Sequence, residues 1–173
     1  MDFKIKIAAT PLMLLLFLYP NLSKGQETGI GVSALYNFQT NGIGLGLRVP
    51  FNTQDQVSWT PQLAYYLPFD KVSEYVLGLA MEYKFIRWSN ADLYTILHGG
   101  YDNWSNASKS GMKGATIANW DGELGLGLAG RNCLKPFVEY RYNLRFLETH
   151  IQVGIIYVFG CGNTNIDRCP AYQ

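Results

Sequence analysis

The chain has 173 residues, 14% of them aromatic, and a formal net charge of +1. This length predicts a single domain. A charge so close to zero argues against a nucleic-acid-binding protein, which would carry a strongly basic surface. The aromatic content is high for a soluble protein of this size and points to an unusual environment for the rings.

Residues 1–25 have the layout of a secretory signal peptide. Six residues with two lysines come first, and an apolar run from Ile7 to Pro20 follows, which is too short to cross a bilayer as a helix. Small side chains at Ser23 and Gly25 predict cleavage after Gly25, with an uncleaved N-terminal anchor as the alternative. Cleavage removes three lysines and one aspartate, so the formal charge changes from +1 to −1.

The rest of the chain up to residue 160 alternates between large apolar and polar or small side chains. A period of two predicts β-strands, whose successive side chains lie on opposite faces. Asn41-Gly42 indicates a tight hairpin turn, and Pro61 predicts a bulge because proline cannot donate to the ladder. The predicted strands are 29–38, 43–51, 57–67, 75–85, 92–102, 120–131, 138–146 and 151–160.

The charged residues of these segments all lie on the face opposite the large apolar ones. A lysine or arginine facing lipid near the bilayer midplane would cost about 2–4 kcal/mol, so we expect the charges to point inward. An eight-stranded barrel is just wide enough for side chains to fill, and glycines on the same face leave room for long side chains. We therefore predict an ionic network in the lumen instead of a pore. Its members are Arg48, Glu82, Lys84, Glu139, Arg141 and Arg145, with inward glycines at 44, 46, 78, 125, 127 and 154.

The fold predicted for residues 26–160 is all-β, an eight-stranded antiparallel up-and-down transmembrane barrel. With the first strand starting in the periplasm, the longest connection, 103–119, is extracellular, and the short connections 52–56, 87–91 and 132–135 are periplasmic. Barrels of this kind keep their long loops outside the cell. Aromatic residues occur at both ends of the outward faces, as expected of belts at two membrane interfaces.

Several other residues are candidates for a site. His98 with Asp102 could form a base with its orienting partner, although a hydrogen-bonded lumen histidine is the simpler interpretation, and His150 is expected in an exposed loop without a role. Trp104, Lys109 and Lys113 are candidate contacts of the 103–119 loop with lipopolysaccharide phosphates or another surface, with a plain solvated loop as the alternative. The sequence 125–130 matches Gly-x-Gly-x-x-Gly, but it lies within a strand and does not open a helix, which excludes a dinucleotide site.

Three cysteines remain in the exported chain, where disulfides can form. Cys161 and Cys169 are the expected pair, Cys133 with Cys161 is the alternative, and the third thiol is free or joins another molecule. The segment 161–173 is predicted to be a periplasmic tail that could contact a protein partner. No spacing typical of a metal site is present, and no cofactor is expected.

The eight alternating strands, the terminal Tyr157-Val158-Phe159 and the signal peptide together resemble the OmpA/OmpX-type outer-membrane barrels. The strand 136–143 looks like those of small barrels from Bacteroidetes-like bacteria. The resemblance implies a bacterial outer-membrane location, with lipid and lipopolysaccharide as partners. It is architectural and supports the fold more than a function; the function we expect is a structural or interaction role without catalysis. The tail 161–173 departs from the pattern, since such barrels usually finish at the aromatic residue.

Two other functions stay open. Small barrels of the lipid A deacylase kind carry a His-x-Ser element facing the lipid, but here His98 and His150 are followed two positions later by Gly100 and Gln152, which argues against a lipid-modifying enzyme. A narrow channel or a binder of small apolar ligands would need an emptier lumen than the charged and bulky inward residues predict.

Overall fold

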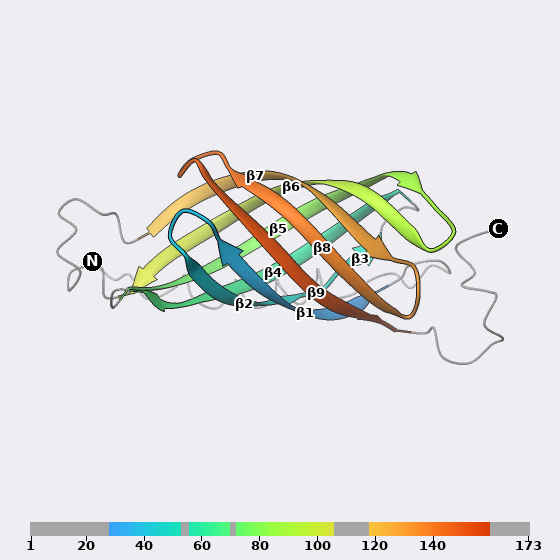
Figure 1. Ribbon diagram of the computed structural model, residues 1–173, viewed down its shortest axis with the longest axis horizontal. Helices are drawn as coiled ribbons and strands as arrows, with labels where there is room; N and C mark the ends of the chain where they lie inside the picture. The colour runs from blue at the N-terminus through green and yellow to red at the C-terminus, as the bar shows by residue number, and fades with distance from the viewer. Residues whose placement is uncertain (1–27, 53–55, 70–71, 106–117, 160–173) are drawn as a thin grey trace, which may run out of the picture.

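The computed structural model describes residues 28–52, 56–69, 72–105 and 118–159. These residues form a single twisted sheet that closes on itself (Figure 1). The strands are β1 (Gly29–Asn37), β2 (Gly42–Arg48), β3 (Phe51–Asn52), β4 (Val57–Phe69), β5 (Val72–Arg87), β6 (Ala91–Ser105), β7 (Ala118–Gly130), β8 (Leu134–Asn143) and β9 (Glu148–Val158). The predicted signal peptide, the tail 161–173 with Cys161 and Cys169, and Lys109 and Lys113 lie outside the described residues.

The sheet is antiparallel throughout, and the first and last strands close it. β1 pairs with β9 from Gly29↔Val158 to Asn37↔His150. β2 and β3 are two parts of one barrel strand, because the register on β4 is unchanged between Arg48↔Gln62 and Phe51↔Trp59. The interruption falls at Pro50, which has no N–H to donate. The predicted eight-stranded antiparallel barrel is therefore confirmed.

The barrel has two distinct ends. We call the end that carries the connections β1–β2, β4–β5, β6–β7 and β8–β9 the long-loop end, because the β6–β7 connection is the longest in the chain. The end where β1 begins and β9 finishes is the terminal end. None of the described residues forms a helix that is long and apolar enough to cross a membrane.

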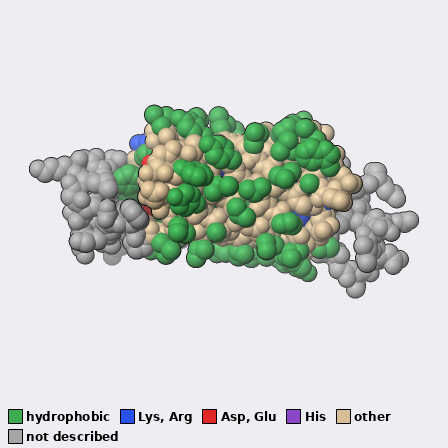
Figure 2. Space-filling view, in the orientation of Figure 1, with side chains coloured by type: hydrophobic (Ala, Val, Ile, Leu, Met, Phe, Trp, Pro, Cys, Tyr) green, Lys and Arg blue, Asp and Glu red, His purple; other side chains and the backbone are tan. Residues whose placement is uncertain are grey.

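Alternate side chains along each strand are buried and exposed, and the predicted phase is confirmed. The outward side chains are large and apolar: Leu45 is 61% exposed and Leu77 is 60% exposed. The inward ones include Arg48 and Glu139, which are 1% and 0% exposed. Figure 2 shows hydrophobic side chains spread along the whole visible length of the barrel. The hydrophobic effect would turn such a surface inward in water, so this surface fits the hydrocarbon of a membrane.

Outward aromatic rings lie near both ends of the strands, as the sequence predicts. At the terminal end Tyr157 packs edge-on against Phe159, and at the long-loop end Tyr101 packs against Trp120. Trp120 is 72% exposed and is the most exposed of the large apolar side chains among the described residues. Rings at both interfaces are expected of a barrel that spans a bilayer.

Two local predictions are wrong. Pro61 does not form a bulge, since β4 keeps its register with β5 through Pro61↔Leu79. Its carbonyl accepts a hydrogen bond from Val49 N at 3.0 Å. Pro61 therefore lies opposite the interruption between β2 and β3. Its missing N–H removes no hydrogen bond from a regular stretch of paired strands. Irregularities occur elsewhere, on β4 between Tyr66 and Phe69 and on β5 between Lys84 and Ile86.

The predicted seventh strand runs too far. β8 ends at Asn143, whose side-chain oxygen accepts hydrogen bonds from the backbone N–H groups of Arg145 and Phe146, each at 3.0 Å. An asparagine that binds the backbone two residues ahead forms a turn, and Leu147 completes it with a φ of 55°. The β8–β9 turn therefore comes earlier than the alternating pattern suggests, and Arg145 lies in it.

Candidate functional site

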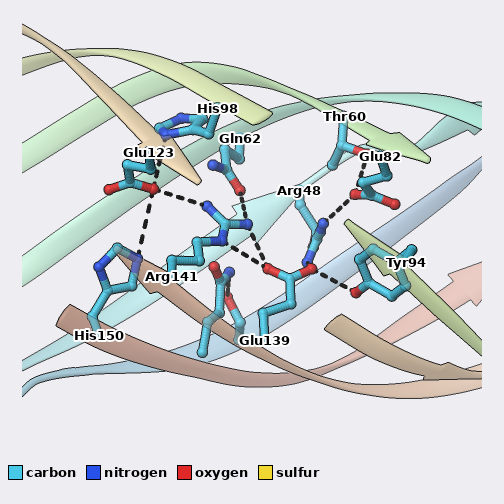
Figure 3. Close-up of polar contacts among 12 residues, drawn as sticks. Arg48, Thr60, Gln62, Glu82, Tyr94, His98, Glu123, Glu139, Arg141 and His150 are labelled. Atoms are coloured by element: carbon cyan, nitrogen blue, oxygen red, sulfur yellow. Dashed lines mark hydrogen bonds and ion pairs between the residues drawn. The ribbon is translucent and has the colours of Figure 1, made fainter. Parts of the chain in front are cut away.

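Arg48 on β2 is a fully buried charged side chain at the centre of the barrel. Its Nη1 donates to Glu139 Oε1 at 2.6 Å, and its Nη2 donates to Glu82 Oε1 at 2.5 Å. The guanidinium carbon lies 4.4 Å from the centre of the Phe137 ring. Arg48 therefore joins two carboxylates from strands that are far apart in the sequence (Figure 3). The Phe137 ring covers one face of its guanidinium.

Both carboxylates have further donors. Ser58 and Thr60 on β4 donate their hydroxyls to Glu82, at 3.1 and 2.7 Å. The phenol of Tyr94 on β6 donates to Glu139 Oε1 at 2.7 Å. Burying a carboxylate costs several kcal/mol unless its charge and its hydrogen-bonding capacity are both satisfied. Here donors from β2, β4 and β6 bind the two carboxylates.

Arg141 on β8 continues the chain of contacts. Its Nη2 and Nε donate to Glu139 Oε2 at 2.5 and 3.0 Å, and Nη2 also lies 3.1 Å from Gln62 Oε1. Its Nη1 reaches Glu123 Oε2 at 3.4 Å. Glu139 is thus held by two guanidiniums at once, and Arg141 joins it to a third carboxylate.

Two histidines meet Glu123 at the same oxygen. His98 Nδ1 lies 2.9 Å from Glu123 Oε2, and His150 Nε2 lies 3.6 Å from it. The prediction that His150 lies in an exposed loop is wrong, because the early turn starts β9 at Glu148 and turns His150 inward, opposite Arg141. His98 pairs with Glu123, whereas Asp102 accepts a hydrogen bond from Trp104 Nε1 at 3.0 Å. The predicted His98–Asp102 pair is therefore not formed.

These contacts form one connected set, which we call the ionic ladder. It consists of Glu82, Arg48, Glu139, Arg141, Glu123, His98 and His150. Its members come from β2, β5, β6, β7, β8 and β9, so the ladder crosses the lumen and ties six of the nine strand segments together (Figure 3). Three carboxylates and two guanidiniums leave one negative charge that a single histidinium would balance.

Of the six residues predicted for the lumen network, the structure brings four together: Arg48, Glu82, Glu139 and Arg141. Lys84 lines a cavity at the terminal end of the lumen. Arg145 is exposed in the β8–β9 turn, where it donates to Trp120 O at 2.7 Å and to Asn119 Oδ1 at 3.0 Å, so its predicted place in the lumen is wrong.

Trp104 also lies elsewhere than predicted. β6 continues to Ser105, so Trp104 belongs to a strand and not to a loop, and its ring packs against Phe146 with centroids 5.8 Å apart. The prediction for the 103–119 connection is therefore too long at both ends, because β7 begins at Ala118. Its central residues, 106–117, lie outside the described part of the chain.

Sequence reasoning missed Glu123, Tyr94 and Gln62 as partners in the ladder. Glu123 lies at an inward position of its strand, and this position in the alternating pattern could have identified it. Tyr94 and Gln62 are uncharged polar residues at inward positions, and only the register between strands places them beside Glu139 and Arg141.

Two small cavities flank the ladder. One, of about 40 Å³, lies at the terminal end beside Lys84, Asp92 and Tyr94. The other, of about 20 Å³, lies beside Tyr66, His150 and Gln152. A buried water needs roughly 10–15 Å³ of such space, so each cavity has room for one or a few waters. Among the described residues, no group of three or more histidine, cysteine or acidic side chains is placed to hold a metal ion.

Adding one methyl group at Gly78 is expected to displace His98. A Cβ at this position would lie 2.0 Å from His98 Nε2 and 2.8 Å from Gly99 O. Overpacking of this kind typically costs about 1–3 kcal/mol, so we expect Gly78→Ala to lower the free energy of unfolding in detergent or liposomes by that amount.

Gly99→Ala is the matched control, because a Cβ at Gly99 would have no neighbour within 4 Å. We expect this outward substitution to change stability by less than about 0.5 kcal/mol. Equal effects of the two substitutions would contradict the packing of His98 against Gly78.

No family model matches the sequence, and no curated protein matches it. Solved structures do match its fold. The N-terminal β-barrel domain of OprF from Pseudomonas aeruginosa is 15% identical, with a TM-score of 0.57 and coverage of 77% of this chain and 97% of that one. A de novo designed transmembrane β-barrel is also 15% identical, with a TM-score of 0.51 and coverage of 79% and 97%.

A second designed protein, TMB2.3, is 12% identical, with a TM-score of 0.50 and coverage of 78% of this chain and 94% of that one. At such low identity the likeness concerns the fold, and it agrees with the strand order, the closure and the apolar exterior described above. The predicted Bacteroidetes-like origin stays a prediction. This chain has the fold of the small eight-stranded bacterial outer-membrane β-barrels of the OmpA/OmpX type.

Proposed function

We propose that this protein is a non-enzymatic outer-membrane barrel with a structural or interaction role. In this proposal the barrel anchors the chain in the membrane, and the long-loop end presents the β6–β7 connection outside the cell. The observation that carries the proposal is the ionic ladder, which fills the centre of the lumen and ties six strand segments together. A lumen filled in this way favours a membrane anchor over a channel.

The sizes of the lumen cavities support this choice over a channel or a small-ligand binder. Ligand pockets generally enclose about 300–1,000 Å³. The cavities on the two sides of the ladder measure about 40 and 20 Å³. Guanidinium–carboxylate contacts of 2.5–3.4 Å lie between them, so a permeating ion would have to break buried pairs.

The positions of the histidines argue against a lipid-modifying enzyme. The chain has two histidines, and both are buried in the lumen, His98 at 2% and His150 at 4% exposure. An enzyme that acts on a membrane lipid through a histidine base needs that base within hydrogen-bond reach of the reacting group. Both imidazoles instead face Glu123 from inside the barrel wall.

Two measurements compare the proposal with its two rivals. Purified barrel is reconstituted in planar bilayers, and we expect no unitary conductance steps, because the ladder closes the lumen. Lipid A from cells that express the protein is analysed by mass spectrometry, and we expect its mass spectrum to match that of cells without the protein. Discrete conductance steps would favour the channel, and a new lipid A species would favour the enzyme.

The direction of insertion has a separate test. An epitope within 106–117 is expected to bind antibody on intact cells, because long loops of such barrels face outward. The same epitope within 88–90, in the β5–β6 turn, is the matched control and is expected to need permeabilised cells. The reverse pattern would mean that the barrel presents the opposite end.

A further inference from the structure

The outer wall of the barrel is hollowed between β1, β2 and β4. This groove has a volume of about 390 Å³, far larger than the cavities of the lumen. Five outward apolar or aromatic side chains and the backbone of two inward residues line it: Val32, Leu45, Leu47, Leu63, Tyr65, Ser33 and Gly46. We call it the outer groove.

The hydroxyl of Ser33, which lines the groove, is already hydrogen-bonded on the inner side of the wall. Ser33 is 7% exposed, and its hydroxyl accepts a hydrogen bond from Gln152 Nε2 at 2.7 Å inside the barrel. Gly46 has no side chain, and a Cβ there would point inward, 2.5 Å from Ser33 Oγ. The floor of the groove is therefore plain backbone, and its walls are apolar.

We propose that the outer groove binds one acyl chain of a membrane lipid. The proposal rests on the membrane location proposed above, because the groove is continuous with the apolar exterior of the barrel. A flexible hydrocarbon chain matches its apolar lining, because each contact between apolar atoms adds a small dispersion attraction and a chain can make many of them. The groove contains no charged side chain that a headgroup would need.

The register of the strands gives the groove a direction. Val32, Leu47 and Leu63 face one another at one level of the wall. Leu45 and Tyr65 form the next level, nearer the long-loop end. Tyrosine in a lipid-facing wall prefers the interface, where its hydroxyl can meet polar groups. The bound lipid therefore belongs to the leaflet at the long-loop end, with its headgroup on the Tyr65 side.

The size of the groove favours a lipid chain over a second copy of the protein. Stable protein–protein interfaces use roughly 20–30 residues on each side. Seven residues line the outer groove, which is far fewer than such an interface uses. A single chain of methylene groups fills such a groove without needing a wider complementary surface.

The test uses lipid retention. Folded protein from liposomes of phosphatidylethanolamine and phosphatidylglycerol is extracted into detergent and examined by native mass spectrometry. We expect one retained phospholipid per barrel, and about a tenfold lower occupancy, equivalent to about 1.4 kcal/mol, for Leu47→Trp, which fills the groove. The matched control is Leu126→Trp on β7, since Leu126 and Leu47 are similarly exposed, at 56% and 52%.

Each outcome decides the matter. Loss of lipid from Leu47→Trp alone supports the groove, and equal retention by all three proteins overturns it. A mass of two chains that disappears in Leu47→Trp would replace the lipid by a second copy. If none of the three proteins inserts into liposomes as a heat-modifiable barrel, both the membrane location and the groove proposal are wrong. If they insert normally but retain no lipid, only the groove proposal is wrong.

Discussion

Replacement of Arg48 by methionine is expected to destabilise the barrel by roughly 3–5 kcal/mol, because it leaves Glu82 without its cation and Glu139 with only one of its two guanidiniums. Arg48 contacts Glu139 at 2.6 Å and Glu82 at 2.5 Å, and its side chain has no exposed surface. Methionine keeps much of the side-chain volume, so the loss reports the charge and not a cavity. The measurement is urea unfolding in liposomes, followed by tryptophan fluorescence and by the heat-modifiable gel shift.

Arg145→Met is the control for this experiment, since Arg145 is exposed in the β8–β9 turn. Exposed interactions of this kind contribute about 0–1 kcal/mol. A double-mutant cycle of Arg48→Met with Glu82→Gln should show a coupling of about 0.5–3 kcal/mol, as expected of neighbours in one network. Equal stabilities of the Arg48 and Arg145 variants would contradict a ladder that stabilises the barrel.

An arginine in place of Leu97 is expected to have the second largest effect. Leu97 lies near the middle of β6, is 50% exposed, and faces Met81 and Leu124 on the neighbouring strands. An outward arginine at the bilayer midplane costs about 2–4 kcal/mol. We therefore expect Leu97→Arg to lower the free energy of unfolding in liposomes by that amount and to reduce the fraction of protein that inserts.

Leu97→Ala separates the charge from the loss of the leucine side chain. The alanine variant removes the same apolar group and should insert nearly as well as the unchanged protein. If arginine were tolerated as well as alanine, position 97 would face water, and the apolar wall of the barrel would not be the surface that contacts lipid.

The sequence predicts the barrel well because its strongest signal is local. Alternation with a period of two assigns each side chain to one face, and this assignment holds even where the two faces are reversed relative to a soluble protein. Arg48, Glu82, Glu139 and Arg141 were therefore found from phase alone. Their pairing was not predictable in detail, because Arg48 and Glu139 are 91 residues apart and meet only through the register of the whole sheet.

The errors also have a physical cause. Alternation continues through residues 144–146, yet the side chain of Asn143 captures the backbone N–H groups of Arg145 and Phe146 and ends the strand. A turn made by one side chain leaves no trace in a hydrophobic pattern. That single difference moved Arg145 out of the lumen and brought His150 into it.

The contact between β1 and β9 has a consequence for how the chain assembles. The pairing of these two strands joins Gly29 with Val158 and Asn37 with His150. β1 therefore cannot pair on its second edge until β9, the last strand, has been synthesised. Until then two open rows of N–H and C=O groups would invite pairing with other chains. Contacts that distant in sequence also form slowly. The unfolded chain therefore needs a chaperone until β9 has been made. Shortening β9 should cause aggregation even where the remaining contacts of the folded barrel are unchanged.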